Sequence, residues 1–309
     1  MSNKETTSNI QQRATLRAED GIAVETEQES IHPVGPDDAD PGTGSSDQDD
    51  LRIRMIVIRK LMFRRGSREI LKDINLEINH GTVVAIMGMS GCGKSTLLRL
   101  IAGLERPHRG GIYVAGTDIA RLSEQELDRV RRTMGFVFQG AALFDYLTVF
   151  ENVAFPLRRN SALNEKQIGE RVASMLSLVG LDGTDSLLPS ELSGGMQKRV
   201  GLARAIAMDP PPQIVLYDEP TSGLDPIMTA VINDLIMRVR DELGVTSVMV
   251  THDMKSIRSA DQVAMIHGGM IEALGTPAEI MDSANPVVDQ FIHGRAEGPI
   301  DVVHSTVEL

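Results

Sequence analysis

Short apolar runs alternate with amphipathic stretches from about residue 53 onward, and this alternation predicts strands interleaved with helices. Three of the runs consist mostly of apolar residues, which is typical of strands that are buried on both faces of a parallel sheet. These runs span residues 83–87, 214–217 and 247–250. The pattern therefore predicts a mainly parallel α/β core.

A stretch without strands interrupts this alternation between about residues 140 and 205. Within it, Asn164 is a good N-cap residue, and apolar side chains follow it at the spacing of an amphipathic helix before Gly180. These apolar positions are Ile168, Val172, Leu176 and Val179. We therefore expect a helical insertion in the α/β core.

Two short helices are predicted near the C-terminus. Thr276 is suited to cap the first, with Pro277 at its first position and Glu279 at its third, and Asn285 and Pro286 begin the second. The second helix carries a short apolar stripe, which must dock on a surface because so short a helix does not fold alone. Its own domain and a partner subunit or regulator remain alternatives. The stripe consists of Val288, Phe291 and Ile292.

Composition separates the first 50 residues from the rest. They hold three basic and twelve acidic side chains, so −9 of the formal net charge of −12 lies there, and they contain few apolar residues. Such a segment buries too little surface to offset the entropy of ordering. We expect a disordered acidic tail over residues 1–50, a folded domain over 51–275, and a helical extension and tail over 276–309.

The same composition excludes several classes of protein. With a net charge of −3, the remaining chain lacks the basic face that nucleic acid binding requires, so no nucleic acid partner is expected. Cys92 is the only cysteine, which excludes an internal disulfide and a thiol metal site. No run approaches the roughly 18 to 20 apolar residues of a membrane span, and no signal sequence is evident. We expect a soluble, cytoplasmic chain.

A glycine-rich loop follows the strand predicted at 83–87 and leads into a helical stretch. It fits the pattern G-x-x-x-x-G-K-[ST], in which glycines let backbone N–H groups wrap closely around phosphates. Lys94 is placed to bridge the β- and γ-phosphates of a nucleoside triphosphate, and Ser95 to ligate Mg²⁺. The loop consists of Gly88, Met89, Ser90, Gly91, Cys92, Gly93, Lys94, Ser95 and Thr96.

Two carboxylates follow the strand predicted at 214–217. Asp218 is expected to hold the Mg²⁺ shell, and Glu219 to polarise the attacking water beside the γ-phosphate. Phosphoryl transfer depends on positioning and charge stabilisation more than on covalent chemistry, so this pair suits it. Alone, two acidic residues after a strand are more often a helix cap or a solvated turn. The phosphate loop favours the catalytic interpretation.

At residues 192–199 the sequence reads Leu-Ser-Gly-Gly-Met-Gln-Lys-Arg, which resembles the signature motif of the ABC ATPase family. The resemblance covers roughly residues 53–275 and implies a P-loop NTPase core of the ABC ATPase type, with a helical subdomain at about 140–205 and an antiparallel β edge. It also implies that Ser193, Gly194 and Gly195 approach ATP held by a second copy of the chain. Hydrolysis would then require a head-to-tail dimer.

Further elements resemble this family in order. By that likeness Gln139 senses Mg²⁺ and relays to a transmembrane partner, Asp225 signals across the dimer, and His252 contacts the γ-phosphate. The sequence departs from the family pattern at Met196, where the signature usually has Gln. It also departs at Arg65, near which an aromatic residue normally stacks on adenine. A guanidinium can stack on a purine, so Arg65 is a candidate for base contact, with a plain solvated arginine as the alternative.

Three stretches are similar to the ATPases that serve MCE-protein lipid transporters. This likeness implies an ATPase at the cytoplasmic face of the bacterial inner membrane, bound to two permease subunits and driving phospholipid movement to or from an MCE protein. It also implies a STAS-domain regulator, and it leaves the direction of transport open. The stretches are residues 140–158, the variant signature at 191–196, and 290–299.

Two other functions remain alternatives. An importer of amino acids or metal chelates would share the ATPase chemistry and differ in the surface after Gln139 and in the C-terminal extension. A non-transport ABC protein of DNA repair or translation usually carries long coiled coils or two cassettes, whereas this chain has one cassette and no heptad array.

Overall fold

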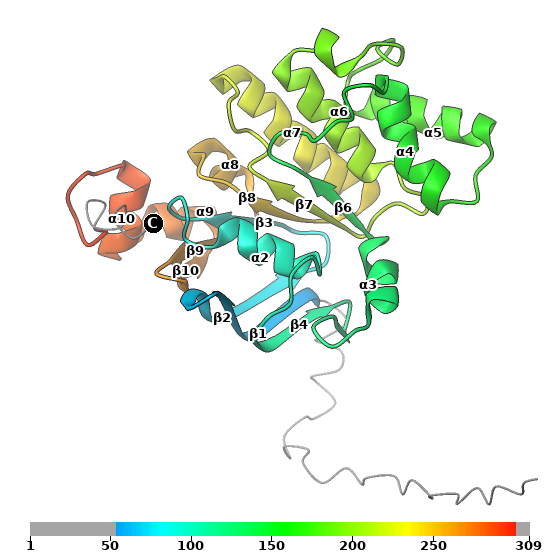
Figure 1. The fold of residues 1–309 in the computed structure, drawn as a ribbon. Helices are drawn as coiled ribbons and strands as arrows, with labels where there is room; N and C mark the ends of the chain where they lie inside the picture. The colour runs from blue at the N-terminus through cyan, green and yellow to red at the C-terminus, as the bar shows by residue number, and fades with distance from the viewer. Residues whose placement is uncertain (1–53, 301–309) are drawn as a thin grey trace, which may run out of the picture. The chain divides into compact units, whose positions relative to one another are not determined.

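The computed structural model describes residues 54–300. The acidic tail expected over residues 1–50 lies outside the described residues. Within them, strands and helices form two sheets with helices on and between them (Figure 1). This arrangement confirms the predicted α/β class.

The larger sheet has six strands in the order β10-β9-β3-β8-β7-β6. All neighbouring pairs are parallel except β10 with β9, which are antiparallel. Every residue of β3 and β8 is buried, as the apolar runs predict. The strands are β3 (Val83–Met87), β6 (Met134–Val137), β7 (Ile214–Asp218), β8 (Thr246–Val250), β9 (Gln262–His267) and β10 (Met270–Gly275).

The smaller sheet is antiparallel, in the order β2-β1-β4-β5, and confirms the expected antiparallel edge. Helix α2 (Lys94–Ile101) lies between the two sheets, and its leucines and isoleucine pack with residues of both. Successive residues of β3 point to opposite faces of the sheet. Val84 and Ile86 pack in the core around α2, whereas Ala85 packs in the core on the other face, against the remaining helices. The strands are β1 (Arg54–Arg65), β2 (Arg68–Asn79), β4 (Arg109–Val114) and β5 (Thr117–Asp118).

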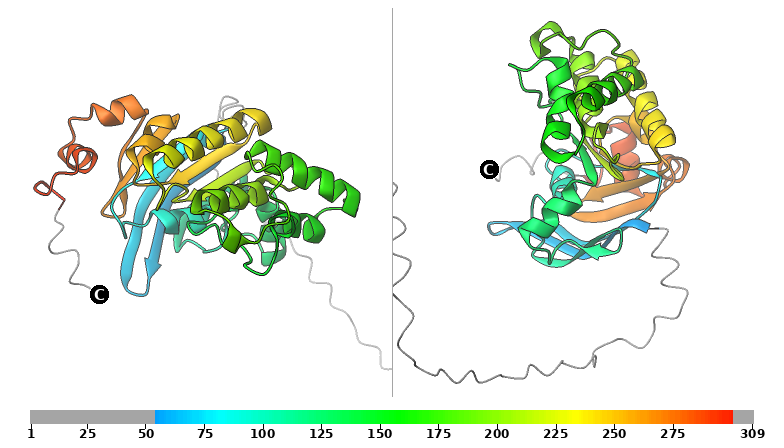
Figure 2. Two further views of the ribbon diagram at one scale, coloured as in Figure 1. Left: turned by 90° about the horizontal axis from the view of Figure 1, so that it is seen from above. Right: turned by 90° about the vertical axis from the view of Figure 1, so that its right-hand side faces the viewer.

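Helices cover the other face of the six-stranded sheet (Figure 2). Among the described residues no strand lies between 140 and 205, which confirms the helical insertion. Asn164 caps α5 as expected: its side chain accepts a hydrogen bond from the N–H of Gln167, whose side chain in turn accepts one from the N–H of Asn164. Besides α2, the α-helices before β7 are α3 (Glu124–Arg131), α4 (Val149–Asn160), α5 (Glu165–Leu178) and α6 (Gly194–Ile206).

The C-terminal helices pack on the chain's own domain. Thr276 caps α9 with Glu279, and Asn285 caps α10, as the sequence predicts. Val288 is fully buried in the core on the helix-covered face of the six-stranded sheet, and Phe291 and Ile292 lie half-buried against it. Of the two surfaces left open by the sequence, the structure therefore uses the chain's own. The helices after β7 are α7 (Pro226–Leu243), α8 (Met254–Ser259), α9 (Pro277–Met281) and α10 (Pro286–His293).

The cap of α5 provides a test of the helical insertion. We expect Asn164→Ala to lower the free energy of unfolding by about 1 kcal/mol, because the first turn of α5 loses a side-chain acceptor. Urea unfolding measures this change. Asn164→Gly is the matched control and should cost only a few tenths of a kcal/mol, since glycine leaves the N-cap backbone open to water. Equal losses for both variants would contradict the assigned cap.

Candidate functional site

The phosphate loop joins β3 to α2 and lies in close contact with both sheets. Gly88 and Gly93 have positive φ angles of 145° and 108°. A Cβ atom on Gly88 would lie 2.3 Å from the carbonyl oxygen of Ile266 in β9, and one on Gly93 would lie 2.7 Å from Leu71 in β2. Only glycine fits either position, so the predicted glycines are required by packing as well as by backbone conformation.

Lys94 folds back over this loop. Its Nζ atom donates hydrogen bonds to the carbonyl oxygens of Gly88 at 2.8 Å and Met89 at 3.0 Å, and the side chain is buried. Helix α2 begins at the same residue, so its free N–H groups and the positive end of its dipole meet the ammonium group in one place. Together they form a concave site for phosphate.

Ser95 and Asp218 meet across the strand ends. Ser95 Oγ donates a hydrogen bond of 2.8 Å to Asp218 Oδ1, which brings together two of the predicted Mg²⁺ ligands. Among residues 54–300 there is no group of three His, Cys, Asp or Glu residues that could hold a metal ion. A hydroxyl and one carboxylate suit Mg²⁺, which takes few protein ligands and completes its shell with phosphate oxygens and water.

Gln139 reaches the same region from the end of β6. Its Nε2 atom donates a 3.5 Å hydrogen bond to Ser222 Oγ, and its backbone oxygen accepts one of 2.8 Å from Lys198 Nζ. Among the described contacts its side chain touches neither Ser95 nor Asp218, so the structure does not bring Gln139 into the candidate metal pair. Sequence reasoning missed both Ser222 and Lys198.

Glu219 has an unusual backbone for a residue with a side chain. Its φ angle of 49° lies in the left-handed region, and its N–H donates to the carbonyl oxygen of Val250 at 2.9 Å. A conformation of this kind costs about 1–3 kcal/mol and is found mostly at functional sites. Lys198 Nζ supports the turn at 3.4 Å from the Glu219 carbonyl oxygen, and burial lowers the pKa of this lysine.

His252 lies against Glu219. Its Nδ1 atom is 2.8 Å from Glu219 Oε2, and its ring is largely exposed whereas the carboxylate is largely buried. An imidazole in this position fixes the direction of the carboxylate. The two residues follow neighbouring strands of the parallel sheet, since β7 and β8 pair with Asp218 opposite Val250.

Most of the predicted site residues line one open cleft of about 680 Å³. Asp218 and Cys92, which were also predicted, are not among its lining residues. Arg65 lies at its edge, where its guanidinium is 3.1 Å from Glu105 and largely exposed. Two further residues, Ile70 of β2 and Phe291 of α10, also line the cleft and were not predicted. Phe291 was expected only as part of the apolar stripe at the C-terminus and of the stretch 290–299, and neither pattern predicts that it lines this cleft. The remaining lining residues are Gly88, Met89, Ser90, Gly91, Gly93, Lys94, Ser95, Thr96, Gln139, Glu219 and His252.

The signature residues lie elsewhere. Ser193 caps α6, its Oγ accepting a 3.3 Å hydrogen bond from the N–H of Met196, and Gly194 and Gly195 form the first turn. Asp225 caps α7, and hydrogen bonds from the N–H groups of that turn lower its pKa. Neither group lines the cleft. The structure thus separates the predicted site into a phosphate cleft and two helix N-termini that do not line it.

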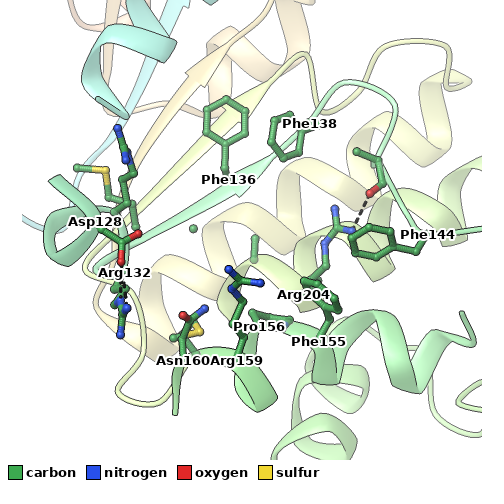
Figure 3. A pocket seen from close by; sticks show the side chains of 16 residues that line it. Asp128, Arg132, Phe136, Phe138, Phe144, Phe155, Pro156, Arg159, Asn160 and Arg204 are labelled. Carbon is green, nitrogen blue, oxygen red and sulfur yellow. Dashed lines mark hydrogen bonds and ion pairs between the residues drawn. The ribbon is translucent and has the colours of Figure 1, made fainter. Parts of the chain in front are cut away.

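A second cavity, of about 440 Å³, lies between β6 and the helical insertion. Figure 3 shows the rings of Phe136 and Phe138 on one side and Phe155 and Arg159 of α4 on the other. Phe138 and Phe155 are each 42% exposed, although both are large apolar side chains. We call this cavity the aromatic groove. Phe138 immediately precedes Gln139, so the aromatic groove adjoins the phosphate cleft along the chain.

Comparisons with known proteins agree with this geometry. Residues 71–222 match the family model described as "ABC transporter". The chain is similar to the intermembrane phospholipid transport system ATP-binding protein MlaF of Haemophilus influenzae, with 44% identity covering 80% of this chain and 93% of that protein. It is 42% identical to the probable ribonucleotide transport ATP-binding protein mkl of Mycobacterium leprae, over 79% of this chain and 70% of that protein.

Solved structures show the same fold. The dimeric, post-hydrolysis state of the ATP-binding cassette MJ0796, bound to ADP and Pi, superposes with a TM-score of 0.66 at 34% identity. The match covers 72% of this chain and 99% of that cassette. The fold therefore has a direct counterpart among ATP-binding cassettes.

Glu219 allows a test of the hydrolytic site. We expect Glu219→Gln to bind ATP with unchanged affinity but to lower kcat by about 10²- to 10⁴-fold, because the amide keeps the shape and loses the base. Fluorescent-nucleotide titration and phosphate release measure the two quantities. Glu242→Gln, on the exposed face of α7, is the matched control and should turn over at the wild-type rate. A Glu219→Gln protein with wild-type turnover would exclude this residue as the base.

Cys92 allows a second test, because it is the only thiol in the chain. Burial raises the pKa of Cys92 above its ordinary value, so the thiolate is scarce at neutral pH. We expect labelling by N-ethylmaleimide to be slow at pH 7, to accelerate as the pH rises, to inhibit hydrolysis, and to be slowed by MgATP. Mass spectrometry follows the label, with Cys92→Ser as the blank. Labelling at one rate with and without MgATP would place the nucleotide elsewhere.

Proposed function

This chain belongs to the ABC transporter family of ATPases, and from that membership we propose that it powers phospholipid transport at the bacterial inner membrane. It is an ATP-binding and ATP-hydrolysing protein. One observation carries the choice of cargo, namely that the identity with the phospholipid transport protein of H. influenzae extends over nearly the whole of that protein. An identity of that length includes the surfaces that meet other subunits as well as the nucleotide site.

The relatives favour lipid over the other importers that the sequence left open. Neither an amino acid nor a metal chelate is named among the relatives compared above. A ribonucleotide is named for the mycobacterial relative, however, which makes it the second candidate cargo. The two cargoes differ in a property that is simple to measure, since a phospholipid remains with the purified complex in detergent and a free ribonucleotide does not.

For hydrolysis, the phosphate loop and Lys94 hold the β- and γ-phosphates, because they gather N–H groups and an ammonium at the start of α2. Ser95 and Asp218 hold Mg²⁺, which neutralises phosphate charge when bound. Glu219 orients the attacking water as the general base. His252 fixes the Glu219 carboxylate at 2.8 Å and reaches toward the γ-phosphate from its exposed position.

A second copy of the chain completes the site. Ser193, Gly194 and Gly195 form a helix N-terminus that lies outside their own cleft, so their free N–H groups are available to a γ-phosphate held by a facing subunit. The solved MJ0796 cassette is itself a dimer with ADP and Pi bound, which supports a head-to-tail pair here. Asp225, at the start of α7, would then lie at the dimer boundary.

The aromatic groove is the surface on which a permease subunit would dock. Exposed Phe138 and Phe155 offer apolar contact, and Arg159 adds a positive charge to the lining of the groove. An amphipathic helix with an acidic side chain would complement this surface. Phe138 lines the groove and the next residue, Gln139, lines the phosphate cleft. A docked helix that displaces Phe138 would therefore also displace Gln139.

The partners follow from this assignment. Two integral-membrane permeases would hold the ATPase dimer at the cytoplasmic face of the inner membrane, with an MCE protein on the periplasmic side and a STAS-domain regulator. Among residues 54–300 no helix is long and apolar enough to cross a bilayer. The acidic tail at 1–50, the ATPase domain at 51–275 and the extension at 276–309 are the proposed parts of the chain.

Affinity purification from native membranes tests the cargo and the partners together. We expect the tagged chain to bring down a permease, an MCE protein and phospholipid, identified by mass spectrometry. A solute permease with a binding protein and no lipid would replace the phospholipid proposal with another importer and leave the ATPase assignment intact.

The same purification tests the aromatic groove. Phe155→Ala should reduce the recovered permease several-fold while the isolated chain hydrolyses ATP at the wild-type rate. Leu274→Ala is the matched control, because Leu274 is a similarly exposed apolar residue on β10, at the opposite edge of the sheet from β6. Equal recovery with both variants would remove the groove as the docking surface.

A further inference from the structure

The family resemblance leads one to expect an aromatic residue near position 65 that stacks on adenine, and the chain has none there. Arg65 occupies that position, and its guanidinium is already engaged by Glu105 at 3.1 Å. Arg99 also approaches Glu105, at 3.8 Å. An arginine held by a carboxylate at the edge of the cleft is less free to lie flat on a purine.

A different aromatic side chain lines the cleft. Among residues 54–300, Phe291 is the one phenylalanine that lines it, and no tyrosine does. It shares the cleft wall with Arg65 and Ile70, which come from the β1–β2 hairpin, and with the phosphate loop. The ring is half-buried, so one part of it packs on the core and another part faces the cleft.

Helix α10 holds Phe291 firmly in this position. At the start of the helix, Asn285 is the N-cap residue, and its Nδ2 atom donates a hydrogen bond of 2.7 Å to Oε1 of Glu272 in β10. In the middle, Val288 is fully buried. Three residues before its end, Gln290 is buried and exchanges hydrogen bonds with the backbone of Ile300, at 2.7 Å and 3.2 Å. The segment after α10 is thus fastened back onto the helix, which limits the movement of the ring.

We propose that Phe291 contacts the nucleoside of bound ATP and takes the part of the missing aromatic residue. The inference rests on the placement of ATP in this cleft, proposed above. The flat face of a purine stacks on an aromatic ring, and such a contact strengthens nucleotide binding. Because Phe291 belongs to α10, nucleotide binding and docking of the C-terminal helix stabilise each other.

Binding measurements with the full-length chain test this contact. We expect Phe291→Ala to weaken ATP and ADP binding about tenfold and to leave binding of inorganic tripolyphosphate unchanged, because the phosphate loop is untouched. Phe291→Tyr should bind ATP nearly as the wild type does, since it keeps the ring. Phe291→Leu should behave as the alanine variant, since it keeps only apolar bulk.

Ile292→Ala is the matched control. Ile292 is the next residue of α10 and is half-buried against the same core, but it does not line the cleft. It should bind ATP as the wild type does, with a thermal unfolding midpoint lowered at least as much as by Phe291→Ala.

Three outcomes would overturn the proposal: unchanged ATP affinity in Phe291→Ala, equal weakening of ATP and tripolyphosphate, or equal weakening in Ile292→Ala. If the wild-type chain bound neither ATP nor tripolyphosphate, the placement of the nucleotide itself would be wrong, which is a distinguishable result.

Discussion

The close approach of the phosphate loop to two different sheets is the constraint on which the site depends. A single added carbon at Gly88 would collide with the backbone of β9, and one at Gly93 would collide with Leu71 of β2. The loop is therefore packed closely against the parallel sheet and the antiparallel sheet at once. Helix α2, which begins in the loop and lies between the sheets, joins the two cores at the same point. The shape of the site and the packing of both sheets therefore depend on the same two glycines.

The strained turn at Glu219 depends on the same framework. Its left-handed backbone persists because neighbouring strand β8 accepts its N–H, and Lys198 of α6 reaches its carbonyl oxygen. Lys198 also holds the backbone of Gln139, so one ammonium group ties the end of β6 to the turn after β7. The helical insertion thus supports the site through Lys198. None of the helices α4, α5 and α6 contributes a residue to the lining of the cleft in the same chain.

Local signals made much of this structure predictable. The buried runs at β3, β7 and β8, and the caps at Asn164 and Thr276, depend on residues within a few positions of one another, and the structure confirms them. The pairing of Ser95 with Asp218 was also predictable, because parallel strands place their carboxyl ends at one edge. Contacts between distant segments were not. Lys198, Ser222 and Phe291 enter the site through tertiary packing. Lys198 lies in the signature stretch and Phe291 in the stretch 290–299, but neither stretch predicts which distant residues these side chains contact.

The adjacency of Phe138 and Gln139 has a thermodynamic consequence. One residue lines the aromatic groove and the next lines the phosphate cleft, so any shift of this segment changes both surfaces at once. Thermodynamic linkage then makes the two effects equal. If nucleotide binding changes the affinity of the groove for its partner by some factor, the partner changes nucleotide affinity by the same factor. The coupling free energy between the two sites is the same whichever site is occupied first. With a permease docked in the aromatic groove as proposed, docking would change nucleotide affinity, and nucleotide binding would change permease affinity by the same factor.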